Sequence, residues 1–184
     1  AEEGANAAGI TAATQMAGEG AGTASHLKAF LTGTVMELKE VGDGVFSEGI
    51  MGEGIAIAPE NDTLYAPADG VVSVLMEDSK HACGLTLANG AELLLHIGID
   101  TVDMQGDGFQ YLVAEGQEVK AGTPLIRFDR EKIKAAGHPD TTVCIVTEPA
   151  NIKNIQFAAD IRCEAGKTEI AFFGQGGRAE RVEM

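Results

Sequence analysis

The sequence predicts an all-β protein, a sandwich or barrel of short strands, and three observations lead to this fold class. Apolar runs of five to seven residues alternate with glycine, proline, asparagine and aspartate. The turn signals recur about every 8 to 15 residues, a spacing typical of β-sandwiches and barrels. The 184 residues include 24 glycines, and tight turns need residues that adopt positive φ at little cost.

Eight segments have the length and apolar content of strands, and one has the pattern of a short helix. The helix is expected over residues 130–136, because Gly137 and Pro139 follow it and end it. The expected strands, in chain order, are 33–38, 54–58, 70–75, 83–88, 91–97, 124–128, 142–146 and 169–173.

The two ends of the chain differ in composition from this central part. Residues 1–25 contain nine alanines and five glycines, with Ile10 and Met16 as the larger apolar side chains. Such a segment buries too little apolar surface to offset the entropy lost on ordering. We therefore expect a flexible linker over residues 1–30, a compact domain over 31–173 and a frayed tail over 174–184. The linker also suggests that the sequence is part of a longer chain.

Charge and cysteine content exclude several classes of partner. The chain has 28 acidic and 13 basic residues, a formal net charge of −15, which argues against nucleic acid and anionic membrane surfaces. Three cysteines in no framework spacing indicate a reducing, cytoplasmic compartment. No apolar run approaches the roughly 20 residues of a membrane-spanning helix. A basic protein or a neutral small molecule remains as partner.

The most informative local pattern is a predicted hairpin that brings two histidines together. Asn89–Gly90 lies between two apolar runs and is a strong hairpin signal. If these two residues form the loop, His96 lies opposite Cys83. His81 then shares their face of the sheet and is a diagonal neighbour of His96. A register shifted by one residue would break this arrangement.

Two neighbouring imidazoles suit group transfer. A neutral imidazole nitrogen is a nucleophile near neutral pH, and a second ring can donate a hydrogen bond to charge that builds on the transferring group. Ser79, two residues before His81, shares its face, so its hydroxyl can hold the His81 ring in one tautomer. The competing interpretation is that His96, between two apolar residues, is a histidine of the core.

The sequence segments around these histidines resemble those of the glucose-type IIA domains (EIIA) of the bacterial phosphoenolpyruvate-dependent sugar phosphotransferase system. The resemblance covers roughly residues 31–173 in several ordered motifs. The matching segments are 45–57 (VFSEGIMGEGIAI), 65–70 (YAPADG), 79–82 (SKHA), 90–102 (GAELLLHIGIDTV), 106–109 (GDGF) and 115–122 (EGQEVKAG).

The resemblance implies a role for each residue of the histidine site. His96 stands at the histidine that receives phosphate through Nε2, and His81 at the second histidine, which stabilises the transferring group. Ser79 stands where the family usually has a threonine that orients the second histidine. The donor would be the histidine phosphocarrier protein, HPr. The acceptor would be a cysteine of the IIB domain, which passes the group to sugar crossing through the membrane domain IIC. The domain would be fused or bound to IIC, so that the linker tethers it to an inner-membrane permease. The family fold is an antiparallel β-sandwich or flattened barrel.

The resemblance also implies a partner-binding surface around the histidines. Its apolar residues would be Val45, Phe46, Ile50, Met51 and Leu94. For each of these, ordinary core packing is the alternative. Two further residues, Asp43 and Asp100, match acidic positions near the site. Carboxylates around a shallow apolar site would complement the basic face of HPr.

Three alternatives and one metal hypothesis remain open at this stage. One alternative is a purely regulatory binding module, which would act on other proteins through the same face. A lipoyl or biotinyl carrier domain has similar sequence motifs at its turns, but it needs an exposed lysine at a hairpin tip. A zinc-binding β-sheet hydrolase would need a third protein ligand beside His81 and His96. Cys83 faces them in the predicted register, although we interpret it as a packing residue. No cofactor is required, and weak zinc binding by the histidine pair is expected.

Overall fold

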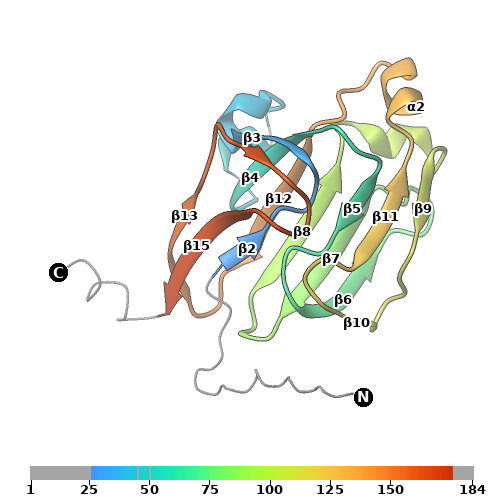
Figure 1. Cartoon of the computed structure of the whole chain (residues 1–184). Coiled ribbons are helices and arrows are strands. Elements are labelled where there is room, and N and C mark those ends of the chain that lie inside the picture. The colour runs from blue at the N-terminus through green and yellow to red at the C-terminus, as the bar shows by residue number, and fades with distance from the viewer. Residues whose placement is uncertain (1–25, 45, 50, 176–184) are drawn as a thin grey trace.

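The computed structural model describes residues 26–44, 46–49 and 51–175 of the chain (Figure 1). Over this part, every pair of neighbouring strands is antiparallel. The described α-helix, α2 (Arg130–Ala135), begins after Asp129, whose side chain accepts a hydrogen bond from the backbone N–H of Lys132. The predicted all-β fold class and the predicted helix are both confirmed.

One large sheet forms one side of the molecule. Its order is β10-β6-β7-β8-β12-β4-β3-β14, and it has eight strands. They are β3 (Gly33–Glu37), β4 (Glu53–Pro59), β6 (Gly70–Leu75), β7 (Ala82–Leu87), β8 (Glu92–Ile97), β10 (Glu118–Val119), β12 (Thr142–Glu148) and β14 (Arg162–Cys163).

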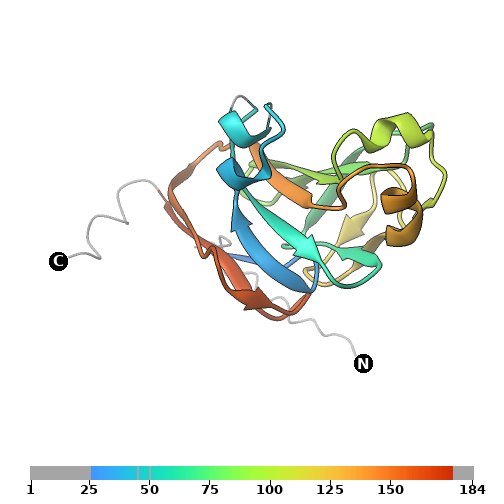
Figure 2. The ribbon, with the colours of Figure 1, turned by 90° about the horizontal axis from the view of Figure 1, so that it is seen from above.

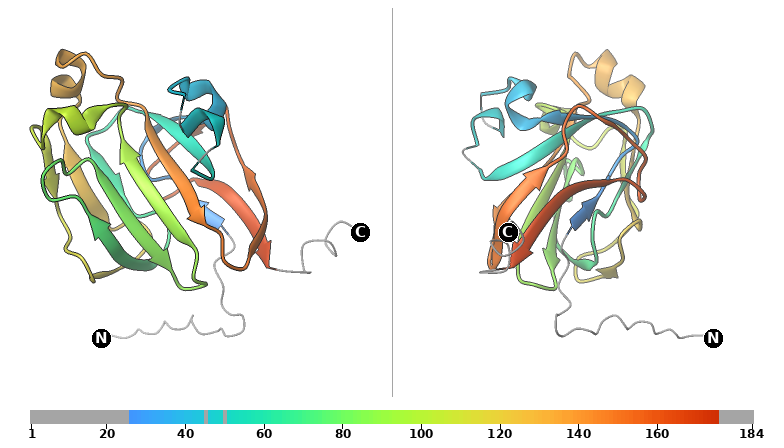
Figure 3. Two further views of the ribbon diagram at one scale, coloured as in Figure 1. Left: turned by 180° about the vertical axis from the view of Figure 1, so that it is seen from behind. Right: turned by 60° about the vertical axis from the view of Figure 1, so that its left-hand side comes forward.

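Two three-stranded sheets cover the inner face of the large sheet. They have the orders β5-β11-β9 and β13-β15-β2. In the view from behind, the large sheet lies in front of them (Figure 3, left). Their strands are β2 (His26–Lys28), β5 (Thr63–Tyr65), β9 (Phe109–Tyr111), β11 (Pro124–Phe128), β13 (Ile152–Phe157) and β15 (Glu169–Gln175).

The strand alternation gives the large sheet two different faces. Leu93, Leu95 and Ile97 of β8 point into the main core, which the three sheets share. Leu94 and His96 point to the outer face. A second, smaller apolar cluster lies on this outer face; its members are Leu38, Phe46, Ala56, Val143 and Ile145, with Met36, Val41, Leu94 and Ile99 packed against it.

The helical segments lie together at one end of the sheets. These are the 3₁₀ helices η2 (Leu38–Val41), η3 (Phe46–Glu48) and η4 (Thr101–Met104), together with α2. They lie at the upper end in Figure 1 and face the viewer in Figure 2. Strand β8 ends at this same end, so η3 and η4 flank the residues that follow His96. Among the described residues, no helix has the length and apolar character of a membrane span.

The predicted domain boundaries need correction at both ends. Residues 26–28 form β2, and Leu27 and Phe30 are fully buried, so the fold begins before residue 31. Strand β15 continues to Gln175, two residues beyond the predicted domain end. The predicted flexibility of 1–25 and fraying of 176–184 concern residues outside the described part of the chain.

The predicted register of the β7–β8 hairpin is wrong by one residue. His96 pairs with Ala82, and Cys83 pairs with Leu95. The loop has three residues, because the N–H of Gly90 bonds to the carbonyl of Leu87 and the next ladder bond joins Leu87 to Ala91. Gly90 takes a φ of 91°, as expected for a turn that ends in a left-handed residue.

Candidate functional site: a histidine pair on the outer sheet face

His96 lies on the outer face of β8, half-buried, between Ala82 of β7 and Val143 of β12. Its Nδ1 lies 3.0 Å from the carbonyl oxygen of Gly98. A carbonyl oxygen only accepts hydrogen bonds, so Nδ1 carries the proton in the neutral ring. The lone pair of the neutral imidazole is therefore on Nε2, the nitrogen that is not held by the backbone.

His81 lies beside His96, although the ladder alone would not bring it there. The carbonyl of His81 accepts from the N–H of Ile97, and a regular strand would place its side chain opposite Ile97, in the core. Strand β7 begins only at Ala82, and the preceding Lys80 has a φ of 55°. The ring of His81 lies edge-on to that of His96, with centroids 4.5 Å apart. The small side chain of Ala82 leaves room for this arrangement.

Ser79 contacts His81 directly. Its Oγ lies 2.8 Å from His81 Nδ1, and both side chains are buried, at 7% and 3% exposed. The hydroxyl can donate or accept, so it accommodates either tautomer of His81. Its bond occupies Nδ1 and orients Nε2 of His81.

Phe46 packs against His96. Its ring centroid lies 4.9 Å from that of His96. The short helix η3 that carries Phe46 begins after Asp43, whose carboxylate accepts from the backbone N–H groups of Phe46 and Ser47. Asp43 therefore fixes the ring that covers His96, and its charge also acts on the histidine.

Both histidines are neutral at physiological pH. Burial, together with the neighbouring His81, lowers the pKa of His96 to about 4, although the Gly98 carbonyl and Asp43 act in the opposite direction. Burial also lowers the pKa of His81. A neutral Nε2 in an apolar setting is a nucleophile that needs no deprotonation step.

The structure brings together only part of the predicted partner surface. Leu94 is half-buried on the outer face, one row from His96, and Met51 is 40% exposed. Asp100 is exposed at a φ of 62°, at the N-cap position of η4, and makes no side-chain cap bond. Val45 and Ile50 fall on residues outside the described part of the chain.

Cys83 does not belong to the histidine face. With the corrected register it pairs with Leu95 and points into the main core, where it is 1% exposed. Burial raises the pKa of its thiol to about 12, so it stays protonated. Within residues 26–44, 46–49 and 51–175, no group of three or more His, Cys, Asp or Glu side chains has the arrangement of a metal site.

Sequence reasoning missed two residues around the site. Val74 of β6 shares a row of the outer face with Gly84 and Leu94, and it is 47% exposed. Thr101 is fully buried and donates through its Oγ1 to the carbonyl of Ile97, directly after His96. Because side chains alternate between the two faces along residues 70–75, Val74 could have been assigned to the outer face once the strand register was known. No feature of the sequence pointed to Thr101.

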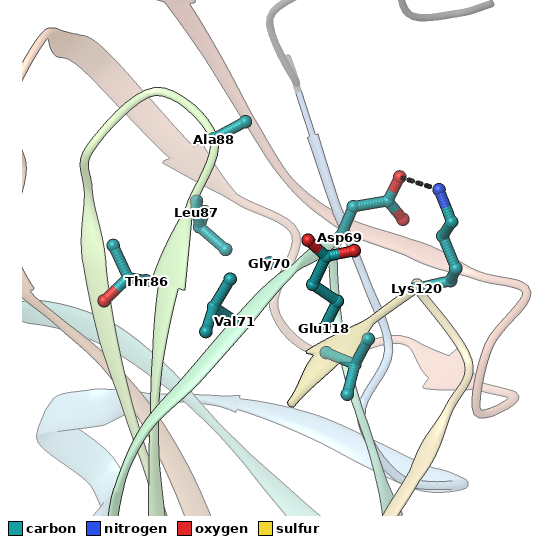
Figure 4. A pocket seen from close by; sticks show the side chains of 9 residues that line it. Asp69, Gly70, Val71, Thr86, Leu87, Ala88, Glu118 and Lys120 are labelled. Atoms are coloured by element: carbon teal, nitrogen blue, oxygen red, sulfur yellow. Dashed lines mark ion pairs between the residues drawn. The ribbon is translucent and has the colours of Figure 1, made fainter. Parts of the chain in front are cut away.

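A pocket of about 400 Å³ lies elsewhere, between the loop end of the β7–β8 hairpin and β10 (Figure 4). Its rim includes Asp69 and Lys120, which form an ion pair at 3.8 Å. None of the predicted site residues lines it. The histidine pair is therefore a surface feature of the outer sheet face, separate from this pocket.

An antiparallel sandwich with a neutral imidazole pair on an apolar sheet face fits the class of small phosphocarrier domains. The family model of the phosphoenolpyruvate-dependent sugar phosphotransferase system, EIIA 1, matches residues 25–152, and the chain belongs to this family. The fold is similar to that of glucose permease IIA from Mycoplasma capricolum, at a TM-score of 0.72 and 33% identity. The match covers 80% of this chain and 94% of that one.

The family settles the general activity. The chain is a glucose-type EIIA domain, a phosphocarrier of sugar uptake and a phosphotransferase component of that system. The resemblance inferred from the sequence motifs is confirmed. The comparisons do not support the lipoyl-type carrier or the zinc-binding hydrolase.

Proposed function

We propose that Nε2 of His96 is the atom that carries the phosphoryl group, received from HPr and delivered to a cysteine of a IIB domain. The observation that carries this proposal is the bond from His96 Nδ1 to the Gly98 carbonyl. It fixes the proton on Nδ1 and leaves the Nε2 lone pair as the nucleophile.

The two transfer steps balance without a further reagent. The Nε2 lone pair attacks phosphorus on phosphorylated HPr, the P–N bond to HPr breaks, and its electron pair returns to the HPr imidazole. In the second step the thiolate of the IIB cysteine attacks phosphorus. The new P–N bond then breaks, and its electrons return to Nε2 of His96.

His81 and Ser79 have supporting roles in this proposal. The His81 ring lies beside His96 and can donate a hydrogen bond to the phosphoryl oxygens, where charge builds in the transition state. Ser79 holds that ring through Nδ1, which directs its Nε2 toward the group in transfer.

The partners bind the outer sheet face around the pair. Phe46, Met51 and Leu94 supply apolar contact, and Asp43 and Asp100 supply negative charge for a basic partner such as HPr. With IIB and the membrane domain IIC as partners, the domain works on the cytoplasmic side of an inner-membrane permease.

Labelling tests the assignment directly. The protein is incubated with the general phosphotransferase enzyme, HPr and labelled phosphoenolpyruvate, and acid-labile label is measured. We expect label on the wild type and on a His138→Gln control, and none on His96→Gln with an unchanged fold. Label retained on His96→Gln would refute the assignment.

A further inference from the structure

We propose that Tyr111 is a positioning residue for phosphoryl transfer, whose hydroxyl holds the β6–β7 connection so that the ring of His81 stays beside His96. The inference rests on the function proposed above and extends it to a residue of a different sheet.

The connection that carries His81 needs an external support. Strand β6 ends at Leu75 and β7 begins at Ala82, and the carbonyl of His81 already bonds to the N–H of Ile97, so residues 76–80 form the part of the connection outside the ladder. Within them, the N–H of Lys80 bonds to the carbonyl of Met76, and Lys80 takes a φ of 55°. A non-glycine residue in this region is unfavourable and persists only where the surroundings hold it.

Tyr111 supplies that support from β9, in the small sheet β5-β11-β9. Its hydroxyl accepts from the N–H of Met76 at 2.8 Å and donates to the carbonyl of Ala82 at 2.6 Å. A phenol hydroxyl has one donor and free acceptor positions, so the two bonds coexist. One oxygen atom therefore ties both ends of the connection together.

Tyr111 itself is held in a strand and stays protonated. Tyr111 pairs with Ile126 of β11, and its ring packs against the main core. Burial raises the pKa of Tyr111 to about 12, so the hydroxyl remains a donor at neutral pH.

The hydrogen bond from Tyr111 to Ala82 acts next to both histidines. Ala82 follows His81 in the chain and is the residue opposite His96 in the ladder. A bond to the Ala82 carbonyl therefore fixes the backbone where His81 leaves the strand. On the other side, Gly106 lies against the connection so closely that an added Cβ would be 2.7 Å from the carbonyl oxygen of Asp78.

The test compares Tyr111→Phe with Tyr65→Phe, a matched loss of a hydroxyl on β5. Three quantities are measured: the NMR titration of the His81 ring, phosphorylation by HPr, and onward transfer to IIB. For Tyr111→Phe we expect the pKa of His81 to rise toward its ordinary value, because a loosened connection admits water. Onward transfer should slow by about threefold to tenfold, because only part of the free energy of the two lost hydrogen bonds acts on the position of His81, and phosphorylation by HPr should stay near the wild-type rate.

Three results would overturn the proposal. They are an unchanged titration of His81 in Tyr111→Phe, an equal slowing of both transfer steps, or the same changes in Tyr65→Phe. The titration uses unphosphorylated protein, so it separates a failure of this inference from a failure of the proposed function.

Discussion

Replacing Gly98 by alanine tests the local geometry that prepares His96. Gly98 has a φ of 76°, and its carbonyl holds His96 Nδ1. An added Cβ would lie 2.4 Å from Thr101 Cγ2 and 3.0 Å from the carbonyl oxygen of Pro139. The substitution therefore combines backbone strain with crowding against a buried threonine.

The two contributions have different expected sizes. A left-handed non-glycine residue costs about 1–2 kcal/mol, and overpacking costs about 1–3 kcal/mol. Gly98→Ala should therefore lower the free energy of unfolding by about 2–5 kcal/mol. Gly122→Ala is the matched control, because Gly122 has a φ of 92° but no atom within 4 Å of the added Cβ. Only the strain of about 1–2 kcal/mol is expected there.

Urea unfolding of both variants measures the difference. The rate of phosphorylation by HPr should also fall about tenfold to a hundredfold for Gly98→Ala, because the carbonyl that orients His96 moves. Adding Thr101→Ser should restore part of the stability, since serine lacks the crowded methyl group and keeps the hydroxyl. If Gly98→Ala destabilises the protein no more than Gly122→Ala, the crowding argument is wrong.

Three further predictions concern the histidine pair. His81→Gln should accept phosphate from HPr but transfer it to IIB about 10² to 10³ times more slowly, measured by chase of labelled protein; an equal loss of both steps would indicate a role in building the site. Zinc should bind the two imidazoles weakly, with micromolar or higher dissociation constants by calorimetry. Zinc binding should be lost in His81→Ala and in His96→Ala. It should be unchanged in Cys83→Ala, because the thiol points into the core. A large loss of zinc affinity in Cys83→Ala would contradict the corrected register. The unfolded chain protonates His96 near pH 6.5 and the folded one only near 4, so the free energy of unfolding should fall by up to about 3 kcal/mol as pH drops through this window. His96→Gln should remove that part of the pH dependence in unfolding curves, and an unaltered slope would count against a neutral, buried His96.

The sequence predicted secondary structure best where a single segment contained the whole pattern of a strand. Eight of the nine strands with five or more residues were predicted within one or two residues, because each buries an apolar run that turn residues delimit. Strands β2, β5, β9, β10 and β14 have only two or three residues. Strands of two or three residues are too short to show an alternating apolar pattern. Whether such a segment pairs as a strand therefore depends on partners far along the chain. Strand β13 (IKNIQF) is too polar for its position to show in the pattern.

The sequence by itself determined the fold class, the family and the residue types of the site, since these depend on composition and local motifs. Tertiary structure alone decided which side chains meet. The hairpin signal at Asn89–Gly90 fits a two-residue and a three-residue loop, and a shift of one residue exchanges the two faces of a strand. The three-residue loop moves Cys83 into the core and leaves Ala82 opposite His96. His81 reaches His96 only because the connection leaves the ladder at Lys80, a conformation that bonds from a distant strand hold in place.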